Sequence, residues 1–231
     1  MNRFDLSILH FINRFAHRSP IFDEFVVLVS TNNFLKGALV VAVIWWLWFK
    51  DGEIRRKRES LIAGVGAAFV GLAVARISSW IIVRPRPLTV PQLLTRIPYR
   101  IKAVEWEGWS SFPSDHAVLF FALATGIFFA SRRIGWLMFI YVSVFICLPR
   151  VYLGVHYPTD ILAGAAIGVS IGWLANLSTI RKVLTGWALR WLDSRPGQFY
   201  SFSFLLTYQI CELFDPANRI VNFMLRRHLP P

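Results

Sequence analysis

Long runs of apolar residues, separated by short polar segments, dominate the chain. A run of about 17 to 25 apolar residues is long enough to cross a hydrocarbon core roughly 30 Å thick. Runs that approach this length lie near residues 34–49, 61–83, 113–131, 134–150 and 159–178. The pattern predicts an all-α fold, a polytopic membrane helix bundle with about five or six transmembrane helices, the sixth depending on how far the first run extends back toward Phe25.

The two ends of the chain have a different pattern. Residues 1–33 mix apolar and polar positions and are predicted to form amphipathic helices at the membrane interface. Residues 182–231 combine apolar patches with Arg, Asp and Pro, which favours an interfacial helical tail over a further span. We therefore predict an integral membrane domain over residues 1–181, followed by this C-terminal tail.

The charged residues are few and unevenly placed. Hydrophobic residues make up 55% of the chain, and 25 Lys and Arg face 13 Asp and Glu, for a net charge of +12. The basic residues cluster in short loops at 50–60, 131–133 and 181–182, as membrane topology signals do, so no nucleic-acid partner is expected. Those loops should be cytoplasmic in a multi-pass protein of the bacterial inner membrane. The connections 84–112 and 150–158 then face the periplasm.

Three segments on that predicted outer face carry ionisable side chains. They are "VRPRP" at 83–87, "SFPSDHA" at 111–117 and "PRVYLGVHYPTD" at 149–160. Each alone has an ordinary explanation, because arginines snorkel to interfaces, Ser and Asp cap helices, and a histidine can lie at a membrane boundary. Together they place arginines, histidines and aspartates at one depth, which favours a functional site.

The residue types in these segments suit phosphate chemistry. Converging arginines, the Ser114 hydroxyl and the free N–H groups of a helix start form an anion site. Of His116 and His156, one can attack phosphorus while the other protonates the leaving oxygen. A carboxylate such as Asp160 can orient the nucleophilic histidine. No His/Asp spacing resembles a metal-ligand set, so we expect no metal and no other cofactor.

On these segments the chain resembles the type 2 phosphatidic acid phosphatase superfamily of membrane phosphatases. The family signatures are Lys-x6-Arg-Pro, Pro-Ser-Gly-His and Ser-Arg-x5-His-x3-Asp, and the third spacing is met at Arg150, His156 and Asp160. The "RPRP" doublet, the "SFPSDH" segment and the compact length are most similar to bacterial undecaprenyl-pyrophosphate phosphatases of the bacitracin-resistance type.

The resemblance implies a role for each matching residue. The catalytic residues would be the nucleophile His156, which forms a phosphohistidine, its partner Asp160, and the leaving-group acid His116. The phosphate ligands would be Arg86, Ser114, Arg150 and the backbone N–H groups near Asp115.

The chain departs from the family pattern at three positions. Ser79 stands where the first signature has its lysine, so Arg76, one helical turn earlier, and Arg84 are the candidates to supply the missing cation. Asp115 replaces the glycine of the second signature and would repel a phosphate unless it caps the helix or pairs with an arginine. Pro149 replaces the serine of the third signature.

The expected activity is hydrolysis of the terminal phosphate of undecaprenyl pyrophosphate at the periplasmic face. The expected partners are a polyprenyl or glycerolipid phosphate substrate and membrane lipids. Loop residues that could grip the second phosphate, or serve only as interfacial anchors, are Arg96, Arg100, Lys102, Trp106 and Trp109. Three alternatives stay open: hydrolysis of phosphatidylglycerophosphate, phosphatidate or a lipid A phosphate, a lipid phosphotransferase, and a non-catalytic lipid-binding or transport relative.

Overall fold

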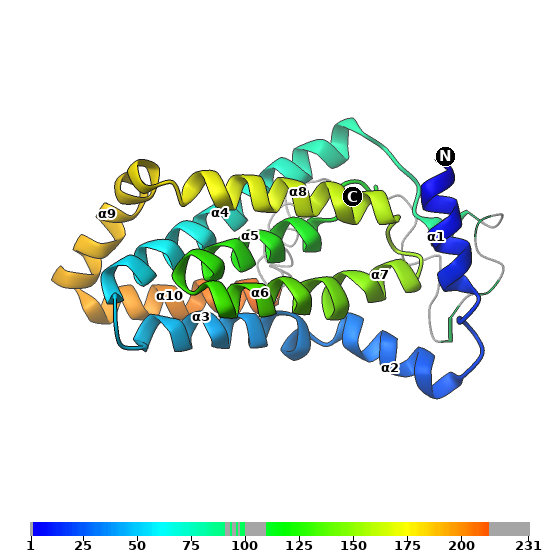
Figure 1. Cartoon of the computed structure of the whole chain (residues 1–231), viewed down its shortest axis with the longest axis horizontal. Helices are drawn as coiled ribbons and strands as arrows, with labels where there is room; N and C mark the ends of the chain where they lie inside the picture. The colour runs from blue at the N-terminus through cyan, green and yellow to red at the C-terminus, as the bar shows by residue number, and fades with distance from the viewer. Residues whose placement is uncertain (1, 91–92, 94–95, 97, 100–109, 213–231) are drawn as a thin grey trace, which may run out of the picture.

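The computed structural model describes residues 2–90, 93, 96, 98–99 and 110–212, and every regular element in this part of the chain is helical (Figure 1). The α-helices are α1 (Arg3–Asn13), α2 (Pro20–Thr31), α3 (Leu39–Phe49), α4 (Ile54–Ile81), α5 (Asp115–Ala130), α6 (Arg132–Tyr141), α7 (Leu148–Tyr152), α8 (Pro158–Ala175), α9 (Ser178–Ser194) and α10 (Pro196–Cys211). The shorter segments are η1 (Phe34–Ala38), η2 (Pro87–Thr89) and η4 (Val142–Cys147). The all-α prediction is confirmed.

Helix α5 is the centre of the bundle. It packs chiefly against α4 on one side and α8 on another. From His116 to Ile127 its residues are buried, apart from the half-buried Phe121. After the first turn its sequence contains no charged residue, so it can be surrounded by other helices without leaving a charge away from water. The N-terminus of α5, which carries His116, is thereby held between α4 and α8.

Two glycines allow the neighbouring helices to approach α5 at backbone distance. A Cβ atom added to Gly64 of α4 would lie 2.7 Å from the Cα atom of Gly126, and one added to Gly164 of α8 would lie 2.7 Å from the carbonyl oxygen of Ser114. Small residues at helix contacts are the usual means of close packing within membranes. Gly164 therefore sets the spacing between the first turns of α5 and α8.

Three helices are long and apolar enough to cross a membrane: Ile54–Ile81, Arg132–Tyr152 and Pro158–Ala175. The pair Pro20–Thr31 and Phe34–Phe49 passes the same test but is bent by 60°, so among the described residues up to four spans are supported. Helix α5 is apolar but shorter, with 16 residues. Each predicted run is thus helical, while the count of five or six spans stays a prediction.

The two ends of the chain pack on opposite ends of the bundle. Helices α1 and α2 contact α7, and α1 also contacts α8, whereas α9 lies across the other end and α10 returns along α3 (Figure 1). The expected C-terminal helical pair is present as α9 and α10, and residues 213–231 lie outside the described part. That these two ends lie at membrane interfaces stays a prediction.

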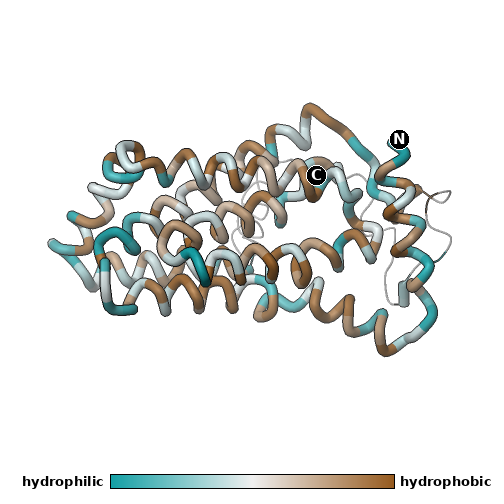
Figure 2. Tube along the Cα trace, viewed as in Figure 1, coloured by the Kyte–Doolittle hydropathy of each residue, from teal (hydrophilic) through white to brown (hydrophobic). Residues whose placement is uncertain are grey.

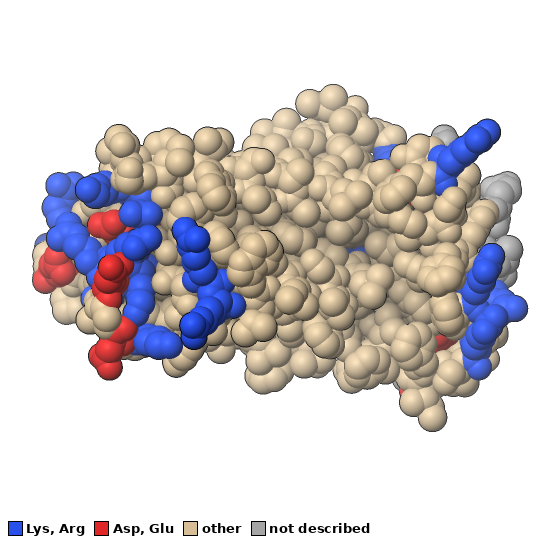
Figure 3. All heavy atoms as spheres, viewed as in Figure 1, with Lys and Arg blue, Asp and Glu red and all other residues tan. Residues whose placement is uncertain are grey.

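Charge and hydropathy follow the same division. Lys and Arg gather at the end formed by the start of α4 and α9, with a smaller group at the end near α1, and few lie between them in this view (Figure 3). The helices between the two ends are mainly hydrophobic (Figure 2). This arrangement suits a chain whose middle lies in a bilayer and whose two ends meet water.

Replacing Gly164 with valine is expected to lower the free energy of unfolding by about 1–3 kcal/mol, because the added side chain would overlap the Ser114 carbonyl and force α8 away from α5. Gly186→Val is the matched control, since a Cβ atom at Gly186 meets nothing within 4 Å. Thermal unfolding in detergent measures both variants. Equal thermal midpoints for Gly164→Val and Gly186→Val would contradict the close contact between α5 and α8.

Candidate active site

His156 lies in a tight turn between α7 and α8. The backbone carbonyl of Arg150 accepts hydrogen bonds from the N–H groups of Val155 at 2.9 Å and His156 at 3.3 Å. Gly154 in the same turn has a φ of 70°, in the left-handed region that glycine adopts without strain. These bonds close the Arg-x5-His segment into a loop, so the spacing seen in the sequence corresponds to a fixed backbone geometry.

The imidazole of His156 is oriented by a backbone carbonyl. Its Nδ1 lies 2.8 Å from the carbonyl oxygen of Ser111, which can only accept, so Nδ1 carries the proton. The expected partner, Asp160, has its Oδ2 atom 3.9 Å from Nδ1, which is too far for a hydrogen bond. The Nε2 atom is thus the nitrogen with a free lone pair, as a nucleophile requires.

His156 is held in its neutral form. Burial, together with the nearby guanidinium groups of Arg150 and Arg86, lowers the pKa of His156 well below its ordinary value. The Asp115 carboxylate and the hydrogen bond to the Ser111 carbonyl act in the opposite direction but do not offset these effects. The imidazole therefore keeps its lone pair well into the acid range.

His116, at the start of α5, has a different partner. Its Nδ1 lies 2.9 Å from Oδ1 of Asp115, which also accepts the backbone N–H of His116 at 2.8 Å. Nη2 of Arg150 lies 2.7 Å from Nε2 of His116. Because a guanidinium only donates, Nε2 is the acceptor and Nδ1–H points to Asp115. The Asp115 carboxylate at Nδ1 favours the imidazolium form, whereas burial and the Arg150 guanidinium oppose it.

A pocket of about 280 Å³ lies between the end of α4 and the start of α5. Its lining residues are Ala75, Arg76, Ser79, Trp80, Arg86, Ser110, Pro113, Asp115 and His156. Two arginines and one candidate nucleophile thus share the pocket with one carboxylate. Nothing in this lining resembles a metal site, and the described residues contain no group of three or more His, Cys, Asp or Glu side chains that could hold a metal ion.

The two pocket arginines are held differently. Arg86 donates from Nη1 to the Val155 carbonyl at 3.0 Å and from Nη2 to the Ser110 carbonyl at 3.3 Å, so its guanidinium is fixed beside the turn of His156. Arg76 donates to Oδ2 of Asp115 at 3.3 Å and is about half exposed. The pairing expected for Asp115 is therefore present, and the cation that meets it comes from the helical turn before Ser79.

The remaining predicted residues do not line the pocket. Ser114 is fully buried and caps α5, its Oγ accepting the N–H of Ala117 at 3.4 Å. Arg150 is buried behind the pocket against His116. Of the loop residues, Arg96 donates to the Arg14 carbonyl at 3.3 Å. The others, Arg100, Lys102, Trp106 and Trp109, lie outside the described residues.

The model of the PAP2 superfamily matches residues 59–183, more than half of the chain. The chain belongs to the PAP2 superfamily. The predicted resemblance is confirmed, and so is the enzyme class, a lipid phosphatase. The three segments that carried the resemblance all fall within the matched residues.

Individual relatives extend this match within the PAP2 superfamily. The chain is 27% identical to undecaprenyl-diphosphatase BcrC of Bacillus subtilis over 163 residues, covering 71% of this chain and 78% of the relative. It is 35% identical to decaprenylphosphoryl-5-phosphoribose phosphatase of Mycobacterium tuberculosis over 122 residues, 53% of this chain and 62% of the relative. The crystal structure of Aquifex aeolicus LpxE aligns with a TM-score of 0.51 at 25% identity, over 74% of this chain and 93% of that one.

Asp5 of α1 lies outside the PAP2-matched residues and binds Arg84 beside the candidate site. Arg84 donates from Nη2 to Oδ2 of Asp5 at 2.7 Å and from Nη1 to Oδ1 of Asp160 at 2.5 Å, and its guanidinium lies 3.7 Å from the centre of the Tyr157 ring. Thr159 donates to Asp5 from its backbone N–H at 2.9 Å and from its hydroxyl at 2.7 Å. Arg84 is therefore bound by carboxylates and is not available to a phosphate in this arrangement.

The local electrostatics favour the charged forms of both Asp5 and Arg84. Burial opposes ionisation of Asp5, but the hydrogen bonds from Thr159 and Arg84 outweigh it and leave the pKa of Asp5 below its ordinary value. Burial likewise opposes the charge on Arg84, but Asp5 and Asp160 outweigh it and raise the pKa of Arg84. No sequence motif marks Asp5 or the Ser111 carbonyl, since Asp5 lies in an amphipathic helix and the carbonyl belongs to the backbone.

Asp5→Asn is expected to lower the free energy of unfolding on the order of 1–3 kcal/mol, because it removes a charged acceptor from Arg84 inside the protein. It should also lower kcat for phosphate release with little change in KM, since Arg84 fixes Asp160 and the start of α8 rather than the substrate. Steady-state kinetics on a lipid phosphate measure this separation.

The matched control for Asp5→Asn is Asp23→Asn. Asp23 is equally buried in the N-terminal helices, but it accepts from the Tyr152 hydroxyl and the His17 N–H and has no contact with Arg84. We expect it to reduce stability while leaving kcat of the folded protein unchanged. An equal fall of kcat in both variants would show that Asp5 acts only through overall stability.

The acid limb of kcat/KM is expected to lie below pH 6.5, the ordinary value for histidine, because the lowered pKa of His156 keeps its imidazole neutral as the pH falls. A pH–rate profile, corrected for the titration of the substrate's own phosphate, measures the position of this limb. A limb at or above the ordinary histidine value would contradict the neutral, buried nucleophile.

Proposed function

We propose that this PAP2 phosphatase is a metal-independent hydrolase that removes the terminal phosphate of undecaprenyl pyrophosphate at the periplasmic face through a phosphohistidine intermediate. The observation that carries the proposal is the orientation of His156. Its Nδ1–H is fixed by Ser111, and its side chain lines a pocket that also contains Arg86 and Arg76. A nucleophilic nitrogen and phosphate-binding cations thus share one cavity.

The substrate is proposed from the relatives and from the pocket wall. One relative is named an undecaprenyl-diphosphatase, and another is named for a decaprenyl-linked phosphate, so both names contain a polyprenyl group. Trp80 lines the pocket and is 80% exposed, and Ile77 and Ile81 beside it are also exposed. This apolar surface next to the phosphate pocket suits a head group that enters sideways from the bilayer.

In the proposed first step, Nε2 of His156 attacks the terminal phosphorus while the bond from phosphorus to the bridging oxygen breaks. The leaving undecaprenyl phosphate takes a proton from His116, and Arg86 and Arg76 compensate the charge on the phosphoryl oxygens. For this step, Arg150 transfers its hydrogen bond from His116 to a phosphoryl oxygen, and the freed Nε2 of His116, which is unprotonated in the structure, first takes up a proton from solvent. The product of this step on the protein is a phosphohistidine, in which phosphorus is bonded to Nε2 of His156.

In the proposed second step, water attacks the phosphohistidine. His116, now neutral, takes the proton from that water, the nitrogen–phosphorus bond breaks, and inorganic phosphate leaves. Both histidines return to their starting states, so the cycle consumes one water and needs no other reactant. The Asp115 carboxylate stabilises His116 in its charged state in both steps.

Replacing His156 with alanine is expected to abolish release of phosphate from undecaprenyl pyrophosphate, since it removes the one imidazole among the described residues that line the pocket. The assay is done in detergent with EDTA present, and the wild type should keep its full activity there. Turnover by His156→Ala, or loss of wild-type activity in EDTA, would contradict the nucleophile or the metal independence, respectively. Acid-labile radiolabel on the wild-type chain would identify the intermediate.

The alternatives share this site and differ in substrate or acceptor. A panel of lipid phosphates, including phosphatidate, phosphatidylglycerophosphate and lipid A, measures the preferred substrate. Phosphate release from undecaprenyl pyrophosphate without any acceptor lipid would exclude an obligate phosphotransferase. Absence of turnover on the whole panel would instead favour a lipid-binding or transport protein.

A further inference from the structure

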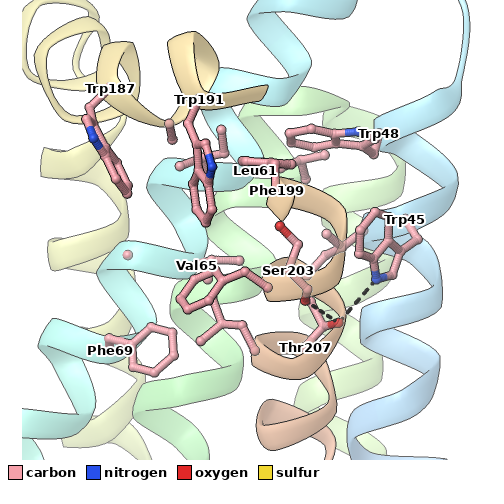
Figure 4. Close-up of a pocket in the computed structure, with 16 residues that line it drawn as sticks. Trp45, Trp48, Leu61, Val65, Phe69, Trp187, Trp191, Phe199, Ser203 and Thr207 are labelled. Carbon is pink, nitrogen blue, oxygen red and sulfur yellow. Dashed lines mark hydrogen bonds between the residues drawn. The ribbon is translucent and has the colours of Figure 1, made fainter. Parts of the chain in front are cut away.

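A second cavity lies far from the histidines, between α3, α4, α9 and α10 (Figure 4). It has a volume of about 230 Å³. None of the 16 residues that line it is charged. The Trp45 indole N–H donates to the Thr207 hydroxyl at 3.3 Å, which itself donates to the Ser203 carbonyl at 2.8 Å, so these polar groups bind one another. The chemistry of this apolar groove suits a hydrocarbon chain.

The apolar groove opens sideways between α4 and α10. Helix α10 packs mainly on α9, η1 and α3. A Cβ atom added to Gly66 of α4 would meet nothing within 4 Å, and Phe202 on α10 is 52% exposed. At the basic end of the bundle, Trp187 and Trp191 of α9 lie over the groove (Figure 4). A chain therefore enters from the side of the bilayer and meets tryptophans at its far end.

Helix α4 joins the apolar groove to the phosphate pocket. The residues that line the groove include Val65 and Phe69, and those that line the pocket include Arg76 and Trp80. Separations of four, seven and four residues place these positions on one side of a helix. At 1.5 Å per residue, the part of the groove lined by α4 begins at Phe69, about 10 Å from Arg76 along the helix axis, and ends at Leu61, about 22 Å from Arg76. The two cavities thus follow one another along the same face of α4.

The distance between Arg76 and the groove sets a minimum chain length for a ligand that reaches both. Lipid chains of one leaflet cover about half of a hydrocarbon core roughly 30 Å thick, or about 15 Å. A chain whose phosphate lies beside Arg76 must pass the midplane of the bilayer to fill the groove. Acyl chains of a glycerolipid or of lipid A end near that midplane, whereas a polyprenyl chain of eleven isoprene units extends beyond it.

We propose that the apolar groove binds the distal part of the substrate's polyprenyl chain and that it makes the enzyme selective for long chains. The inference rests on the proposed function, because it requires a polyprenyl diphosphate in the phosphate pocket. The wall supplied by α10 lies outside the residues matched to the PAP2 superfamily, whereas the wall supplied by α4 lies within them.

The test compares two diphosphates in mixed micelles at equal mole fraction: undecaprenyl diphosphate, and geranyl diphosphate with its two isoprene units. Gly66→Phe fills the groove from α4, and Ser203→Phe fills it from α10. Both should lower kcat/KM for the long substrate by roughly three- to tenfold, since the chain loses packing contacts but stays in an apolar medium. Neither should change kcat/KM for the short one.

Gly186→Phe is the matched control. A Cβ atom there also meets nothing within 4 Å, but Gly186 lines a separate cleft among charged residues at the basic end. The control should leave kcat/KM of both substrates at the wild-type value. Two groove variants on different helices protect the test against misfolding of either one.

Three results would overturn the inference. In the first, both groove variants keep the wild-type preference for the long substrate. In the second, kcat/KM falls equally for both substrates, and the groove is then a structural element only. In the third, native mass spectrometry shows that a co-purified membrane lipid is lost from the groove variants while the chain-length preference is unchanged. The occupant would then be a resident lipid.

Failure of the proposed function would give a different pattern. Wild-type protein would release phosphate from neither diphosphate, and the chain-length inference would fall with it. Wild-type hydrolysis of both diphosphates, with an unchanged preference in the groove variants, would remove the groove inference and keep the proposed function.

Discussion

Arg84 bound between two buried carboxylates is the interaction on which the geometry of the site depends. It joins Asp5 of α1, the exit of α4 and Asp160 at the start of α8, which are far apart in the sequence. A buried charge is costly unless its partners are close and hydrogen-bonded, and here both carboxylates are fully buried and paired. The N-terminal helix, which carries no family motif, is therefore part of the framework of the candidate site.

The ion pairs of Arg84 with Asp5 and Asp160 also determine which arginines can bind a phosphate. With Arg84 occupied, the described pocket presents Arg86, fixed by backbone carbonyls, and Arg76, held only by Asp115 in a half-exposed ion pair. An exposed pair of this kind is weak, so an incoming phosphate can compete for Arg76. The guanidinium of Arg76, one helical turn before Ser79, thus lies in the same cavity and is our candidate to replace the missing lysine.

The sequence predicted those parts of the site that a local motif encodes. The Arg-x5-His spacing corresponds to a closed turn, and Asp115 was expected to meet an arginine, which Arg76 provides. Partners without a side-chain motif could not be found this way. The Ser111 carbonyl is backbone, and Asp5 lies 79 residues from Arg84 in an amphipathic helix where an acidic residue is unremarkable. Likewise the apolar runs predicted the helices, but the side-by-side packing of α10 and α3 depends on tertiary contacts.

The two histidines differ in the charge of the group that orients them, and this difference underlies the roles proposed for them. His156 donates Nδ1–H to a neutral carbonyl and lies near two arginines, which favours the uncharged imidazole that the proposed attack requires. His116 donates to the Asp115 carboxylate, which stabilises the imidazolium needed for the proposed acid role, whereas burial and the Arg150 guanidinium oppose that charge. The carboxylate expected beside the nucleophile is instead bound to Arg84. Asp115, in place of the family glycine, is therefore the carboxylate bonded to the histidine proposed as the acid, whereas the histidine proposed as the nucleophile has no hydrogen-bonded carboxylate.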